Sequence, residues 1–147
     1  MKAFALSFGP PEHGWMVVML GRAEGDAWQV DASDVPCDSL AMLVGAMHAL
    51  LGGAAAFEME WSLEPAYEQW RFVAEPSGEL VRVEVGIAPA KLETFARVPR
   101  RELVTTVWRA LRRLESDPAW SSGDAWSWPF PSADLRALRD VLDRSHA

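Results

Sequence analysis

The sequence has 147 residues, of which 50% are hydrophobic and 24% are charged, with a formal net charge of −7. It shows neither the roughly 18 consecutive apolar residues of a membrane span nor the segmented start of a signal peptide, which predicts one cytoplasmic domain over residues 1–147. The acidic balance disfavours nucleic-acid and membrane partners, and a single cysteine excludes an internal disulfide.

Residues 4–8, 15–20 and 27–32 are predicted to form three strands joined as a meander. The first and third segments alternate large apolar residues with small or polar ones, and the second is a short apolar run bounded by glycines. A helix follows, because apolar residues recur at the spacing of one helix face, namely Leu40, Leu43, Val44, Met47 and Leu51. Pro36 fits the first turn of this helix, and Gly52 fits its end.

Further strands are predicted over residues 57–63, 67–74 and 81–87, with residues 91–98 as a candidate seventh strand. Apolar and polar residues alternate along them, as they do when one face of a sheet is buried and the other is wet. A second helix starts at Pro99 with an apolar stripe of Leu103, Val107, Ala110, Leu111 and Leu114, and a third starts after Pro131. The predicted fold is α+β: a single antiparallel sheet of about six or seven strands, covered on one face by two or three helices.

Residues 61–72 contain four aromatic side chains around a tight connection between two predicted strands. The alternation predicts that three of them point into the core: Trp61, Trp70 and Phe72. Aromatic pairs across neighbouring strands stabilise a sheet, so this segment is interpreted as scaffold. The alternative is that Glu64 and Tyr67 form a ligand-binding pair at the rim of the sheet.

Four features occur in order within residues 28–87. They are the segment Pro36-Cys37-Asp38-Ser39-Leu40, the helix ending at Gly52, the pattern Trp61-x-x-Glu64-Pro65-x-Tyr67-x-x-Trp70-x-Phe72 and the valine-rich strand. Together they resemble small uncharacterised proteins of bacterial genomes, of the orphan and immunity type that accompanies secreted toxins. The resemblance implies a class of function and brings no catalytic residue with it.

Few residues suit catalysis or metal binding. Phosphate-loop, HExxH and nucleophile-elbow patterns do not occur, so neither a cofactor nor a metal is predicted. Cys37 lies near a helix N-terminus, where the helix dipole favours a thiolate, and is the best candidate nucleophile; the alternative is a space-filling residue. His48 lies about three helical turns further on, so it cannot serve Cys37 as a local base. His13 and His146 are predicted to be exposed.

Basic residues concentrate in one part of the chain. Between residues 91 and 113 there are seven basic residues against two acidic ones. Arg109, Arg112 and Arg113 fall off the apolar stripe of the second helix, so we expect them to face solvent or a partner. A docked partner could be an acidic surface, including the sheet of a second copy in a homodimer.

The segment before the last helix carries four large aromatic residues among small and loop-forming ones: Trp120, Trp126, Trp128 and Phe130. Loops often carry function, and tryptophan is enriched at the energetic centres of interfaces, which favours a binding surface. Alternatively, this loop wraps the sheet, and its rings complete the core.

These observations favour a non-catalytic interaction protein, an immunity- or antitoxin-type inhibitor that binds a basic protein partner such as a toxin. Its candidate acidic face consists of outward-pointing strand residues, Glu58, Glu60 and Glu84. An acidic face would steer the protein onto a basic cleft, and aromatic anchors would slow its release. Two alternatives stay open: a small-ligand module with a pocket between sheet and helices near the tryptophan-rich loop, and an enzyme that uses Cys37.

Overall fold

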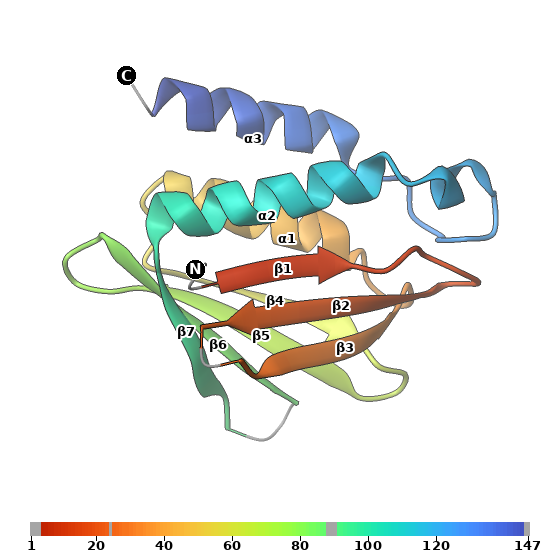
Figure 1. Cartoon of the computed structure of the whole chain (residues 1–147), viewed down its shortest axis with the longest axis horizontal. Helices are drawn as coiled ribbons and strands as arrows, with labels where there is room; N and C mark the ends of the chain where they lie inside the picture. Colours follow the sequence, from red (N-terminus) through yellow and green to blue (C-terminus); the bar gives the residue numbers. More distant parts are fainter. Residues whose placement is uncertain (1–3, 24, 88–90, 146–147) are drawn as a thin grey trace.

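A computed structural model describes residues 4–23, 25–87 and 91–145. Within these residues, seven strands pair antiparallel in chain order to form one open sheet, accompanied by three α-helices (Figure 1). The strands are β1 (Phe4–Phe8), β2 (Trp15–Arg22), β3 (Ala27–Ser33), β4 (Ala56–Ser62), β5 (Tyr67–Ala74), β6 (Leu80–Ile87) and β7 (Glu93–Pro99). The helices are α1 (Ser39–Leu51), α2 (Arg100–Glu115) and α3 (Ser132–Arg144), with a short 3-10 helix over Pro118–Ser121. The predicted α+β class and antiparallel sheet are confirmed.

The aromatic residues between β4 and β5 form part of the core. Trp61, Trp70 and Phe72 are at most 1% exposed, as the alternation predicts. Trp61 and Trp70 lie on adjacent strands with their ring centroids 5.2 Å apart in an edge-to-face arrangement. Such a pair adds about 0.5–1.5 kcal/mol to the stabilisation from area burial. Most of the segment 61–72 is therefore scaffold.

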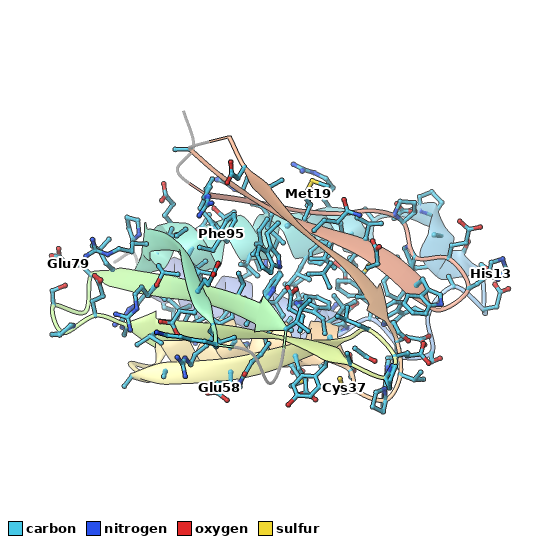
Figure 2. All side chains as sticks on the ribbon, turned by 90° about the horizontal axis from the view of Figure 1, so that it is seen from below. His13, Met19, Cys37, Glu58, Glu79 and Phe95 are labelled. Carbon is cyan, nitrogen blue, oxygen red and sulfur yellow. The ribbon has the colours of Figure 1, made fainter. Side chains whose placement is uncertain are left out.

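The sheet turns a corner between β3 and β4. Within the described residues these strands pair at a single position, Ser33 with Ser62. Beyond it, the chain leaving β3 fills the gap, and the Ser39 hydroxyl donates to the Glu60 carbonyl at 2.6 Å. This carbonyl has no partner on β3, and the side-chain hydroxyl supplies its hydrogen bond instead. Figure 2 shows the two halves of the curled sheet facing each other across the core, with Met19 of β2 and Glu58 of β4 on opposite outer sides.

The helices cover the inner face of the curled sheet. α1 packs on β4, α2 lies along β1, and α3 crosses over both helices (Figure 1). The predicted apolar stripe of α2 is buried, and in α3 the buried residues are Leu135, Leu138 and Leu142. No helix in the described part of the chain is long and apolar enough to cross a membrane.

α1 differs from its prediction at both ends. Pro36 precedes the helix rather than opening it, because the carboxylate of Asp38 accepts the Ala41 N–H at 3.2 Å and so forms the N-cap. At the other end, Leu50 is fully buried and Leu51 is half-buried. Both residues lie on the helix face that contains Met47, since they follow it by three and four positions. Leu50, and not the predicted Leu51, is the one that packs fully into the core.

A second set of contacts joins the two halves of the sheet across the core. Trp28 of β3 and Trp70 of β5 both donate their indole N–H to Glu68, at 2.8 and 2.6 Å. Arg22 of β2 donates to the Phe95 carbonyl of β7 at 3.0 Å and stacks over its ring. Glu68 is 2% exposed, and this burial raises its pKa, although the two indole hydrogen bonds act in the opposite direction.

Candidate protein-binding surface

The outer face of β4, β5 and β6 carries all three predicted acidic residues, and arginines alternate with two of them, Glu58 and Glu84. Arg71 of β5 donates to Glu84 of β6 at 2.7 Å and lies 3.7 Å from Glu58 of β4. Arg82 donates to the other carboxylate oxygen of Glu84 at 3.0 Å. The charge on this part of the sheet therefore changes sign from one side chain to the next. Figure 2 labels Glu58 on this outer face.

Glu84 is 8% exposed, so little of it is available to a partner. Burial acts to raise its pKa, but the hydrogen bonds and charges of Arg71 and Arg82 outweigh burial and hold the pKa below its ordinary value of 4.5. A buried carboxylate held by two guanidinium groups binds three strand positions together. Its role in this structure is to stabilise the sheet.

A different surface lies at the corner of the sheet, where exposed apolar side chains collect. They are Trp15 and Val17 of β2, Val35 after β3 and Tyr67 of β5, each 39–44% exposed. One row of paired residues crosses four strands here, from Trp15 through Ser33 and Ser62 to Tyr67. At the usual spacing of strands this row spans about 14 Å.

Four carboxylates surround these apolar side chains: Glu12, Asp31, Glu60 and Glu64. Glu12 bridges to Trp15 through the backbone, and Asp31 is the cross-strand partner of Val17. Glu64 accepts the Ser33 hydroxyl at 2.5 Å. Within the described residues, none of the four carboxylates forms an ion pair with lysine or arginine. We call the four apolar side chains and the four carboxylates together the corner patch.

The corner patch also contains a shallow hollow of about 420 Å³. Its lining consists of Pro10, Glu12, His13, Trp15, Met16, Val17 and Asp31. The walls are apolar and carboxylates lie at its edges. This combination suits an inserted side chain with an apolar stem and a positive end, such as arginine or lysine.

The tryptophan loop, residues 120–130, packs inward. Trp126 is 7% exposed, and the other three aromatic side chains are partly buried against the core. The backbone N–H and the hydroxyl of Ser127 both donate to the Asp34 carboxylate at 2.7 Å, and the Trp128 indole donates to the Asp34 carbonyl at 2.6 Å. These contacts fasten the loop to the end of β3. They support the interpretation in which the loop completes the core.

The predicted arginines of α2 are exposed, as expected from their place off the apolar stripe. Arg112 lies 3.3 Å from Glu115 in an ion pair along the helix. Arg109 and Arg113 instead line a groove beside β1. Both lie on α2, which contributes no residue to the corner patch.

The candidate nucleophile and the histidines lie apart. Cys37 is half-buried at the start of the chain leading into α1, and its sulfur lies 3.7 Å from the Ser39 hydroxyl. His48 lies on α1 beside the Asp134 carbonyl at 3.1 Å, and His13 lies in the β1–β2 connection beside Asp124. His146 lies outside the described residues. Within those residues, no group of three histidine, cysteine or acidic side chains is arranged to hold a metal ion.

Of the three predicted acidic residues, Glu58, Glu60 and Glu84, only Glu60 belongs to the corner patch. Trp15 and Val17 could not be found from the sequence because β2 is apolar on both faces, so its alternation cannot show which side is buried. Val35 lies in the connection after β3, where no periodicity applies.

Glu64 and Tyr67, the alternative ligand-binding pair at the rim of the sheet, both lie in the corner patch. A signal that could have found part of the patch is that Glu12 and Asp31 each lie at least nine positions from the nearest lysine or arginine in the sequence.

No family model, curated protein or solved structure matches this chain. What supports a function is therefore the geometry of the chain itself.

Proposed function

We propose that the protein is a non-catalytic interaction protein that binds a basic partner protein through the corner patch. The observation that carries this proposal is the coincidence of exposed apolar side chains with carboxylates that no lysine or arginine neutralises. Tryptophan and tyrosine are the side chains that most often dominate the energy of an interface. Unpaired carboxylates around them would accelerate encounter with a positive surface.

The shape of the surface suggests how binding would act. The corner patch wraps the outside of the bend between β3 and β4, so apart from its shallow hollow it is convex. A convex acidic surface complements a concave basic one, such as the cleft of an enzyme that acts on nucleic acid. Occupation of such a cleft would inhibit the enzyme without any chemistry by the inhibitor. This mode fits the immunity- or antitoxin-type function implied by the resemblance of residues 28–87.

The test is affinity capture from a lysate of the source organism at low and moderate salt, with mass spectrometry of the retained proteins. Three baits are compared: the wild-type chain, Trp15→Ala/Tyr67→Ala and Val141→Ala, which truncates a half-buried side chain on α3. We expect one basic protein to be retained by the wild type and by Val141→Ala. The double variant should lose it, with affinity lower by about 100-fold, because two interface aromatics each contribute about 1–2 kcal/mol or more.

Thermal unfolding of each bait provides the control, since both replaced aromatics are exposed and should leave stability nearly unchanged. A partner retained equally by all three baits would contradict the corner patch as the binding surface. Retention that does not weaken as salt rises would contradict electrostatic steering. An empty capture at both salt concentrations would contradict the proposed function as a whole.

A further inference from the structure

A groove of about 590 Å³ runs between β1 and α2, on elements that the proposed function does not use. Figure 1 shows α2 lying along β1 for most of the length of the strand. The helical wall presents one row of residues spaced by four positions: Arg101, Thr105, Arg109 and Arg113. The strand wall is formed by residues 4–7. The groove lies between sheet and helix, but no residue of the tryptophan loop lines it, so it is not the pocket near that loop that the sequence offered as an alternative.

β1 is the first strand of the sheet, so one of its edges has no strand partner among the described residues. The Gly9 N–H donates to the Val17 carbonyl at 2.8 Å, and bonded positions alternate along an antiparallel pair. Ser7 therefore bonds to β2, while the backbone N–H and C=O of Leu6 point away from β2. An edge of this kind offers donors and acceptors in alternation, which suits another extended chain better than a simple anion.

The charge of the groove is positive. Arg109 and Arg113 are exposed and form no ion pair with any carboxylate of the described residues. Arg101 donates to the Ser145 hydroxyl at 2.6 Å, which leaves its charge uncompensated. Glu102 is the one carboxylate among the residues described as lining the groove. The charge balance therefore calls for a negative ligand.

The spacing of the arginines indicates the form of that ligand. Arg109 and Arg113 are separated by one helical turn, about 6 Å along the axis, and Arg101 to Arg113 spans about 18 Å. In an extended peptide, side chains on the same side repeat every 6.8 Å or so. A compact anion would meet one or two of the arginines, whereas an extended chain would meet all three.

We propose that the β1–α2 groove binds an extended peptide segment with acidic residues at alternate positions. Its carboxylates would accept hydrogen bonds from Arg101, Arg109 and Arg113. Thr105 and Thr106, which also line the groove, would contribute hydroxyl groups to the peptide backbone. This site is independent of the corner patch, because it has the opposite charge and lies on other elements.

The test uses fluorescence anisotropy with a labelled decapeptide of alternating glutamate and serine, at 50 and 300 mM salt. The comparison peptides are a block of five glutamates followed by five serines, and alternating lysine and serine. We expect the alternating acidic peptide to bind at least five times more tightly than the block peptide, and the lysine peptide not to bind. Arg109→Glu/Arg113→Glu should weaken the acidic peptide by tenfold or more.

The matched control is Arg112→Glu/Arg136→Glu, which changes the net charge equally on exposed positions outside the groove. It should weaken binding less than threefold. Equal weakening by both double variants, or no binding by the wild type, would overturn the proposal. So would pyrophosphate displacing the peptide at equal concentration, because the groove would then be a site for compact anions. A dimer in sedimentation velocity that Arg109→Glu/Arg113→Glu dissociates would overturn it in favour of self-association.

Discussion

Two parts of the outer face of the sheet carry carboxylates and use them differently. On β4, β5 and β6, Glu58 and Glu84 alternate with Arg71 and Arg82, and the side chains form a connected row of ion pairs. At the corner, the carboxylates flank exposed apolar side chains, and none of them is paired with an arginine of the described residues. The first arrangement stabilises the sheet, and the second leaves charge available to a partner.

The difference shows that an acidic strand face cannot be inferred from its carboxylates alone. Cross-strand neighbours lie about 5 Å apart, so an arginine on the next strand reaches a glutamate more readily than a partner protein does. What decides the character of a surface is the pairing between strands. The register therefore carries functional information that the sequence of each strand lacks.

The largest effect that would sharpen this comparison is expected for Glu84→Ala. Removal of this carboxylate leaves Arg71 and Arg82 without their shared acceptor and opens a gap beneath them. Because both arginines are partly exposed and can be hydrated, we expect a loss of about 1–2 kcal/mol of unfolding free energy, less than for a fully buried pair. Urea denaturation followed by tryptophan fluorescence measures it.

Glu58→Ala is the matched control for this measurement. Glu58 is more than half exposed and lies 3.7 Å from Arg71, so its loss should cost less than about 0.5 kcal/mol. If the two variants lose equal stability, the contrast between a buried and an exposed member of the same row is wrong.

The next largest effect concerns the other region. Asp31→Lys/Glu60→Lys reverses two charges of the corner patch and should reduce the association rate with the captured basic protein by about tenfold at low salt. The dissociation rate should change less, because the apolar side chains stay in place. Surface plasmon resonance at two salt concentrations separates the two rates. Glu79→Lys/Asp140→Lys, with the same change in net charge at exposed sites away from the corner, should leave the association rate within about threefold.

The elements whose faces are strongly patterned could be predicted from the sequence. The alternation of β4 and β5 places Trp61, Trp70 and Phe72 correctly, and the apolar stripe of α2 is buried as expected. In each case one face is apolar and the other polar, so a single burial pattern satisfies the whole segment. The antiparallel order follows from short connections between consecutive strands, except between β3 and β4, where α1 intervenes.

The corner itself could not be predicted in this way. It depends on Ser39 capturing the Glu60 carbonyl in place of a strand, and on β3 pairing with β4 at one position. Both are contacts between distant residues, which local periodicity does not report. The alternation of β5 predicts that Glu68 is buried, since it lies on the same face as Trp70. Its two indole partners cannot be predicted in this way, because they lie on different strands.

Glu68 and Glu75 offer the smallest effect and a test of sign. Burial raises the pKa of Glu68 above 4.5, so the folded state holds its proton more tightly than the unfolded chain does. Stability from this group is present below pH 4.5 and is lost as pH rises through the raised pKa. The hydrogen bond from Arg97 lowers the pKa of Glu75, so its contribution is present above pH 4.5 and is lost as pH falls through the lowered pKa.

Unfolding free energies of the wild type, Glu68→Gln and Glu75→Gln, measured from pH 3 to 7, separate the two contributions. The wild type should lose stability relative to Glu68→Gln as pH rises above about 4.5, and relative to Glu75→Gln as pH falls below it. A flat difference between the wild type and Glu68→Gln across this range would contradict the raised pKa and would show that the two indole donors solvate the Glu68 carboxylate as well as water does. In that case the burial of Glu68 between the halves of the sheet would carry no electrostatic cost. The difference between the two carboxylate regions would then depend only on whether an arginine lies beside the carboxylate.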